Sequence, residues 1–234
     1  MSLWKNKLLS DNRTGWEDLK VLLKNERELV ASYVRKLIED RLTVGTSGNI
    51  SIYNREKDLI AISPSGMNYF EVEPEDVVII DRSGEVIDGS RKPSSEKDMH
   101  RLLYTHRNDV SAAVHTHSEF ATLIACLNMP IEPIHPILAC AGENVRCAPY
   151  MISHNEVFGE TVIKYIKDRY AVLLGNHGVL TCGPNIGYAY TTAISVEFCA
   201  ELYYRAKAVG EPRLLSEADM SDMMHRFQSI RERQ

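Results

Sequence analysis

The sequence predicts an α/β fold in which a mainly antiparallel sheet is flanked by helices. Several short runs of β-branched residues are joined by tight turns, and such hairpins favour antiparallel pairing over a doubly wound parallel sheet. Segments with helical periodicity lie before, between and after these hairpins. The chain has 234 residues, of which 44% are apolar and 25% charged, as is typical of a globular protein with a full hydrophobic core.

In the first half of the chain, apolar residues at helical spacing predict an amphipathic helix over 17–42. Glycines and an asparagine at 45–49 predict a tight loop before two hairpins. A second helix is expected from about 95 to 107, with Ser95 as its N-cap and Asp98 three residues later. The expected strands are 50–53, 59–62, 77–80 and 85–87.

In the second half, a buried strand over 110–114 precedes an apolar helix. Four prolines predict irregular structure over 130–149. The last helix, from about Glu217, is polar and is expected to fray. The other expected elements are helices 118–127, 156–168 and 185–208 and strands 171–174 and 179–182.

Composition and charge argue against several classes of protein. A net charge of −5 gives no electrostatic footprint for nucleic acid, and no apolar run approaches the about 18 to 20 residues needed to span a membrane. The first residues lack the hydrophobic core of a secretory signal. Five cysteines without a Cys-x-x-Cys pair indicate a reducing compartment. We therefore expect a cytoplasmic protein, with residues 1–234 forming a single domain.

Two histidines, His115 and His117, follow the strand over 110–114. Side chains alternate along a strand, so both imidazoles are expected on one face, where they can share a metal ion. A third histidine, His177, lies between two glycines at another strand end. For the His-x-His motif alone, the competing interpretation is one solvated and one hydrogen-bonded structural histidine.

Glu96 and three short loops are further candidates for a functional site. Glu96 stands at an expected helix start, where a carboxylate also simply complements the helix dipole. The loops at 46–49, 65–66 and 94–95 combine hydroxyl groups, an amide and glycine N–H groups, which together suit a phosphate. Each loop taken singly is better explained as a simple turn.

Five motifs occur in a fixed order along the chain. They are Ser-Gly-Asn at 47–49, Ser-Pro-Ser-Gly at 63–66, Pro-Ser-Ser-Glu at 93–96, His-Thr-His at 115–117 and Asn-His-Gly at 176–178. In this order they resemble the class II aldolase and adducin-head superfamily, over roughly residues 25–205. The segment Cys-Ala-Pro-Tyr at 147–150 is most similar to its fuculose-phosphate aldolase branch. The resemblance implies a three-layer α/β/α domain.

The same resemblance assigns roles to the candidate residues. One Zn²⁺ per chain would be bound by His115, His117 and His177, and Glu96 would be the catalytic carboxylate. A glutamate at this position argues against the epimerase branch, which usually has aspartate there. The residues expected at the substrate phosphate are Thr46, Gly48, Asn49, Ser65, Gly66, Ser94 and Ser95.

The chain departs from the family where proton donors are expected. Pro136 and Ile230 stand where fuculose-phosphate aldolase has active-site tyrosines, and Cys140 stands where the epimerase has an aspartate. The second proton donor is therefore unassigned. The candidates are His135, Glu143 and Tyr150.

The reaction implied by the resemblance is reversible cleavage of a ketose 1-phosphate, similar to L-fuculose 1-phosphate, to dihydroxyacetone phosphate and an aldehyde. Two enzymatic alternatives stay open: sugar-phosphate 4-epimerisation, and dehydration of the methylthioribulose-phosphate type. A non-catalytic adducin-like head is the alternative from another class. The expected partners are the phosphorylated ketose and identical subunits, in a homotetramer with interface active sites; no nucleic acid or membrane partner is expected.

Overall fold

The computed structural model describes residues 21–152 and 155–233, which contain an eight-stranded sheet of order β4-β3-β2-β1-β5-β8-β7-β6. Neighbouring strands are antiparallel except for β6 and β7, which are parallel. The predicted mainly antiparallel sheet is therefore confirmed. The strands are β1 (Asn49–Asn54), β2 (Leu59–Ile62), β3 (Val78–Asp81), β4 (Val86–Asp88), β5 (Ala112–Thr116), β6 (Cys147–Ala148), β7 (Ala171–Leu174) and β8 (Gly178–Gly183).

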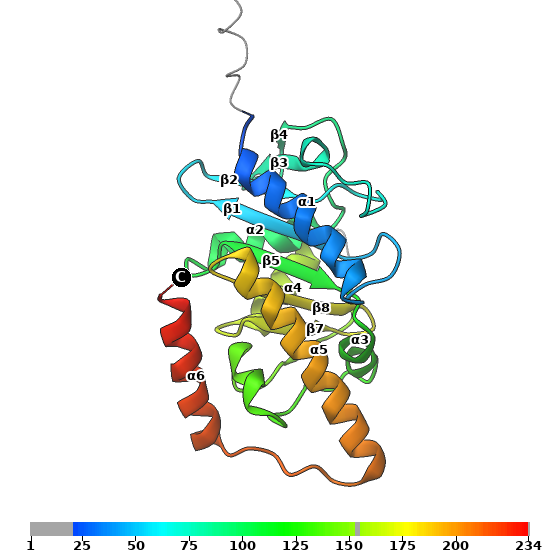
Figure 1. Cartoon of the computed structure of the whole chain (residues 1–234), viewed down its shortest axis with the longest axis vertical. Helices are drawn as coiled ribbons and strands as arrows, with labels where there is room; N and C mark the ends of the chain where they lie inside the picture. Colours follow the sequence, from blue (N-terminus) through cyan, green and yellow to red (C-terminus); the bar gives the residue numbers. More distant parts are fainter. Residues whose placement is uncertain (1–20, 153–154, 234) are drawn as a thin grey trace, which may run out of the picture.

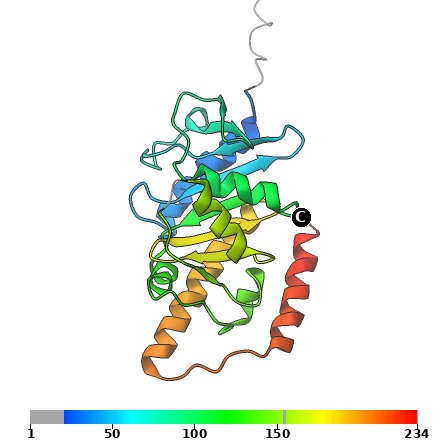
Figure 2. The same cartoon turned by 180° about the vertical axis from the view of Figure 1, so that it is seen from behind.

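Helices lie on both faces of the sheet. Figure 1 shows α1 and α5 in front of the strands, and the reverse view in Figure 2 brings α2 and α4 to the front. In the described ranges, no helix combines the length and the apolar composition needed to cross a membrane. The helices are α1 (Lys24–Glu39), α2 (Lys97–His106), α3 (Glu119–Cys126), α4 (Glu156–Ile166), α5 (Ile186–Val209) and α6 (Glu217–Arg231), with 3₁₀ turns η1 (Pro74–Asp76) and η2 (Pro136–Cys140).

The starts of two helices differ from the prediction. α1 begins at Lys24 because Leu23 has a left-handed backbone with φ of 55°, and residues 17–20 of the expected helix lie outside the described residues. α2 begins at Lys97, and its N-cap is Glu96 without a side-chain capping bond. The predicted capping role of Ser95 is therefore wrong. Ser94 instead accepts a hydrogen bond from the Glu96 N–H at 3.2 Å, which turns the segment before the helix.

The segment 130–149 is largely irregular, as predicted, although it also contains η2 and the short strand β6. The last helix, α6, is better anchored than its polar sequence suggested. Met220 on α6 is fully buried, and the guanidinium group of Arg231 near its end donates to the Tyr188 hydroxyl at 2.6 Å. Arg231 also lies 4.2 Å from the ring centroid of Tyr170. These contacts attach both ends of α6 to the rest of the fold.

Alternating side chains of the strands pack against different helices. On β1, Ile50 belongs to the core cluster with α1 and α5, whereas Tyr53 belongs to the cluster with α2 and α4. Alternate residues share a face, so Asn49 and Ser51 point toward the side of α2 and α4. His115 on β5 is the register partner of Asn49 and points the same way. The sheet thus presents an amide and an imidazole side by side near the start of α2.

Gly48, directly before β1, approaches β5 more closely than a side chain would permit. Its φ is +82°, and a Cβ atom there would lie 2.7 Å from the carbonyl oxygen of His115. Gly45 in the same loop has a φ of +66°, but a Cβ atom there would meet nothing within 4 Å. The two glycines therefore share a left-handed backbone and differ in the space around them.

We expect Gly48→Ala to lower the free energy of unfolding by more than Gly45→Ala, as measured by urea denaturation. Each substitution carries a cost of about 1–2 kcal/mol for the left-handed backbone. Only Gly48→Ala also forces the chain away from β5. Equal losses of stability in the two variants would contradict the close approach of Gly48 to His115.

Candidate active site

Three histidine side chains converge at one end of the central strands. His115 lies on β5, His117 follows the last residue of that strand, and His177 lies in the turn between β7 and β8. Their ring centroids are 4.8–5.0 Å apart in pairs, and one nitrogen of each lies within 4.8 Å of the others. The structure therefore brings together the three histidines that the sequence singled out, at distances that allow a shared metal ion.

Burial and hydrogen bonding favour neutral imidazoles in this cluster. His115 is fully buried, and burial lowers its pKa to about 3. Its Nδ1 lies 3.0 Å from the carbonyl oxygen of Val179, an acceptor, so Nδ1 carries the proton. The lone pair of Nε2 then faces Nε2 of His117 at 3.0 Å. Burial and the adjacent His177 also lower the pKa of His117. Neutral imidazoles with oriented lone pairs are the form in which histidine binds metals.

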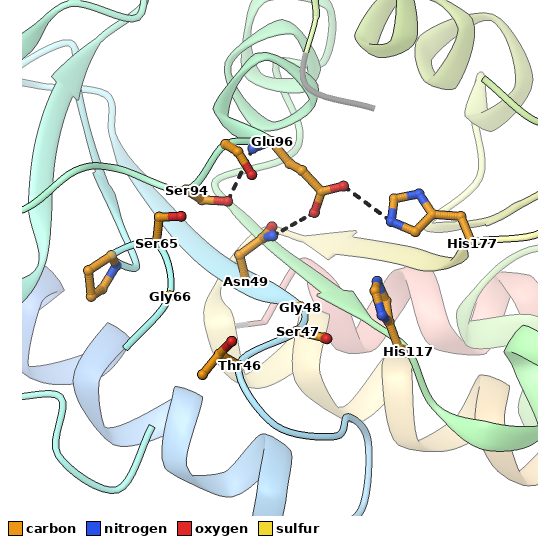
Figure 3. A pocket seen from close by; sticks show the side chains of 12 residues that line it. Thr46, Ser47, Gly48, Asn49, Ser65, Gly66, Ser94, Glu96, His117 and His177 are labelled. Atoms are coloured by element: carbon orange, nitrogen blue, oxygen red, sulfur yellow. Dashed lines mark hydrogen bonds and ion pairs between the residues drawn. The ribbon is translucent and has the colours of Figure 1, made fainter. Parts of the chain in front are cut away.

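The carboxylate of Glu96 faces this cluster from the start of α2 (Figure 3). Its Oε1 lies 3.2 Å from Nε2 of His177, and its Oε2 lies 3.3 Å from Nε2 of His115. Asn49 donates a hydrogen bond from Nδ2 to Oε2 at 2.8 Å. Burial alone would raise the pKa of Glu96, but the two histidines and the Asn49 amide outweigh burial and hold the pKa well below its usual range. Glu96 is therefore a buried carboxylate at the edge of the histidine cluster.

A pocket of about 260 Å³ opens beside Glu96 and unites the predicted phosphate-binding loops. Figure 3 shows that the predicted phosphate-binding residues come from the loop before β1, the turn after β2 and the segment before α2. Apart from Glu96 and the histidines, the described residues of the walls carry no ionisable side chain, and they carry several hydroxyl groups. The lining residues are Thr46, Ser47, Gly48, Asn49, Pro64, Ser65, Gly66, Ser94, Ser95, Glu96, His117 and His177.

The three loops are held in place by contacts that sequence reasoning missed. Tyr69 is buried, and its hydroxyl donates to the carbonyl oxygens of Thr46 and Gly48. The loop 63–66 pairs with the segment 92–94 through two backbone hydrogen bonds. The N–H of Ser65 donates to Lys92 at 2.9 Å, and the N–H of Ser94 donates to Ser63 at 3.1 Å. The only sequence signal for this role of Tyr69 was a large aromatic residue between two turns. These hydrogen bonds therefore hold the loops that line the pocket in fixed positions, so they are not three independent turns.

The positions of His117 and His177 depend on two further residues. Glu197 on α5 accepts hydrogen bonds from the N–H groups of Phe120 and Ala121, both at 2.8 Å, and so caps the helix that follows His117. At Gly178, a Cβ atom would lie 2.4 Å from the carbonyl oxygen of Thr116, so glycine is required beside the histidines. Nothing in the local sequence of α5 links Glu197 to α3, and its role could not be predicted.

The three candidates for a second proton donor do not line this pocket. His135 accepts a hydrogen bond from the N–H of Ile137, at the start of η2, and its ring packs against Phe198. Glu143 forms an ion pair with Arg169 at 2.6 Å. Tyr150 is 60% exposed. Among the lining residues that the structure describes, Glu96 is the single carboxylate and none is a tyrosine.

The three imidazoles and the Glu96 carboxylate suit a metal ion that prefers nitrogen ligands. Three imidazole nitrogens converge, and in the described structure the buried Oε1 atom of Glu96 lies 3.2 Å from Nε2 of His177 without forming a well-oriented hydrogen bond. An unpaired carboxylate oxygen facing imidazole lone pairs is unfavourable without a cation between them. Three protein nitrogen ligands also leave coordination positions open, as in catalytic metal sites.

Comparisons with known proteins agree with this site. The family model for the class II aldolase and adducin N-terminal domain matches residues 28–204. The 5-deoxy-D-ribulose 1-phosphate aldolase of Bacillus thuringiensis serovar kurstaki is 49% identical over 208 residues, covering 89% of this chain and 98% of that protein. The 5-methylthioribulose-1-phosphate/5-deoxyribulose-1-phosphate aldolase of Rhodospirillum rubrum is 36% identical, covering 80% of this chain and 84% of that protein.

The structure of an L-fuculose 1-phosphate aldolase superposes with a TM-score of 0.85 at 40% identity, covering 87% of this chain and 96% of the other. The matched family model spans all five motifs, the three histidines and Glu96. This chain therefore belongs to the class II aldolase and adducin N-terminal domain family.

Proposed function

We propose that this chain is a zinc-dependent lyase that cleaves a ketose 1-phosphate reversibly to dihydroxyacetone phosphate and an aldehyde. Its family and its similarity to three aldolases support this class of reaction over an epimerase, a dehydratase or an adducin-like head. The observation that carries the proposal is the Glu96 carboxylate, which lies between the histidine cluster and a pocket of hydroxyl groups. An acid–base group thus stands between the candidate metal and phosphate sites.

The pocket offers the substrate phosphate hydrogen-bond donors rather than positive charge. We assign this role to the hydroxyl and N–H groups of residues that line it. Glycine at two of these positions lets the backbone approach a ligand closely. The proposed phosphate-binding residues are Thr46, Gly48, Asn49, Ser65, Gly66, Ser94 and Ser95.

His115, His117 and His177 would hold Zn²⁺, which when bound supplies Lewis-acid stabilisation of negative charge on substrate oxygens. Breaking the C3–C4 bond converts the C4 hydroxyl group to the aldehyde carbonyl, releases the hydroxyl proton to the second, unassigned proton-transfer group, and leaves excess electron density on the three-carbon fragment. Glu96 returns a proton to C3 of that fragment, or removes it in the condensation direction. The lowered pKa of Glu96 keeps the carboxylate ionised, which is the form that can take up a proton. The Asn49 amide holds one carboxylate oxygen and so fixes the direction of the other.

For the substrate we propose a 5-deoxypentulose 1-phosphate, which would give acetaldehyde as the second product. Two of the matched relatives are named for 5-deoxyribulose 1-phosphate, and one of them is similar over nearly its whole length. Comparing turnover of 5-deoxyribulose 1-phosphate and L-fuculose 1-phosphate tests this choice. Faster cleavage of L-fuculose 1-phosphate would contradict it.

We further propose that residues 1–234 form one three-layer α/β/α domain with its core over about 25–205. Core clusters on both faces of the sheet support this arrangement. A cytoplasmic location is proposed from the five cysteines at 126, 140, 147, 182 and 199, which are all unpaired in the structure.

Purified protein should contain close to one zinc ion per chain, measured by elemental analysis after dialysis. His117→Ala should lose most of this zinc, because one of three nitrogen ligands is removed. His106→Ala is the matched control, since His106 lies at the end of α2 and outside the cluster. Full zinc retention in alanine variants at each of the three cluster histidines would contradict the metal site.

Glu96→Gln should retain zinc but lose exchange of the C3 proton of dihydroxyacetone phosphate with heavy water. The loss should be at least about 10²-fold, the lower range for a general base. This exchange needs no aldehyde and can be followed by NMR. Glu119→Gln, an exposed glutamate near His117, should keep the parental rate.

Two results would contradict this assignment. Unchanged exchange in Glu96→Gln would place the base elsewhere. Absence of exchange in the parent protein, despite bound zinc and demonstrated binding of a phosphate ligand, would favour the dehydratase alternative.

We expect a homotetramer whose subunits complete one another's active sites, as measured by sedimentation at assay concentrations. The pocket has no evident second proton donor among its described lining residues, so a neighbouring subunit is expected to supply one. Ile194 and Phe198 on α5, each 43% exposed, form an apolar surface suited to such contact. A fully active monomer would contradict the proposal.

A further inference from the structure

A chain of buried hydrogen bonds runs from the interior of the sheet to Glu96. The hydroxyl of Tyr104 lies 2.6 Å from Oγ of Ser51, and that oxygen lies 2.7 Å from Nδ1 of His100. Nε2 of His100 lies 2.5 Å from Oδ1 of Asn49, and Nδ2 of Asn49 donates to Glu96 at 2.8 Å. All five side chains are at least nine-tenths buried. Solvent therefore cannot replace a partner in this chain.

The donor and acceptor properties of each atom fix the direction of every hydrogen bond in this series. Oδ1 of Asn49 can only accept, so Nε2 of His100 must carry a proton and donate it. Full burial lowers the pKa of His100 to about 4, so the ring is neutral and its Nδ1 accepts from the Ser51 hydroxyl. The Tyr104 hydroxyl lies within hydrogen-bond distance of both Oγ and the main-chain oxygen of Ser51. Because the Ser51 hydroxyl proton is directed to His100, Tyr104 is the donor in this pair. Every donor thus points toward the carboxylate of Glu96.

From this geometry we infer that His100 is a positioning residue that fixes the amide of Asn49, and through it the carboxylate of Glu96. Without the His100 donor, the buried Oδ1 atom of Asn49 would have no partner, and the amide would rotate away from Glu96 to find one. The carboxylate would then lose a neutral donor. A carboxylate held in one orientation is what proton transfer at C3 requires. The catalytic consequence rests on the function proposed above, whereas the effect on the amide does not.

The buried position of His100 on α2 suggests a purely structural role, but its two ring hydrogen bonds argue against that role. His100 lies on the apolar side of α2, between Met99 and the buried residues that follow. A histidine kept only for packing would be interchangeable with an apolar side chain of similar size. Here both ring nitrogens have partners on β1, and one partner directly contacts the proposed catalytic base. The hydrogen bonds, rather than the volume, distinguish His100 from its neighbours.

The test uses a matched pair of amide substitutions in the full-length protein. In His100→Gln, the amide nitrogen reaches the place of Nε2 and can donate to Asn49. In His100→Asn, the shorter side chain reaches only the place of Nδ1. We expect His100→Asn to slow C3 exchange by about 10- to 100-fold, as for other residues that orient active-site groups. His100→Gln should stay within about threefold of the parent, and both variants should retain zinc.

A double-mutant cycle separates positioning from general stability. If His100 acts through Asn49, His100→Asn should add no further loss of exchange in an Asn49→Ala background. Tyr53→Phe is the control for loss of a hydrogen bond on β1. The Tyr53 hydroxyl contacts Asp58 and takes no part in the series of hydrogen bonds that leads to Glu96. This variant should retain the parental exchange rate. Additive losses in the cycle, or equal losses in the Gln and Asn variants, would overturn the inference.

Crystal structures of the parent and His100→Asn give a readout that does not depend on activity. We expect the hydrogen bond between Nδ2 of Asn49 and Oε2 of Glu96 to be present in the parent and broken in the variant. Retention of this bond in His100→Asn would overturn the role of His100 even if the chain proved to catalyse another reaction. Absence of aldolase activity in the parent, with the bond lost as expected, would instead contradict only the proposed function.

Discussion

Burial of one carboxylate is the constraint around which the active site is arranged. Glu96 is 6% exposed, and an anion removed from water needs partners on every side. The Asn49 amide occupies one oxygen, and the imidazoles of His115 and His177 lie beside the two oxygens. A cation bound by the histidines would complete this environment. The same burial that makes Glu96 costly to keep ionised limits the water that can reach the carboxylate.

The parts of the site that lie in short local motifs could be predicted from the sequence. His115, His117 and His177 stand out because histidines at strand ends beside small residues have a recognisable metal-binding pattern. The loops containing Ser65 and Ser94 were recognisable because hydroxyls and glycine mark turns that suit anions. Hairpin turns likewise predicted most strands, since a tight turn determines which two segments are neighbours.

Residues that act across long sequence separations could not be predicted. His100 resembles a core histidine on an apolar helix face, and only the register of β1 against α2 reveals its contact with Asn49. Glu197 caps a helix that begins 78 residues earlier, at Glu119. Ser95 was expected to cap α2, but the backbone turn that directs Glu96 toward the histidines leaves Glu96 at that position. In each case tertiary contacts overrode a local signal.

The register between β1 and β5 limits how this protein can vary in length. Asn49 and His115 share a face because side chains alternate along paired strands. If Gly48 keeps its place, insertion of a single residue after it would turn Asn49 toward α1 and α5, and the inserted residue would take the place of Asn49 beside Glu96. Such an insertion separates Glu96, the proposed base, from the Asn49 amide even if every candidate active-site residue is retained. Near this register, a change of length is therefore best tolerated before Thr46, where Gly45 has open space around it.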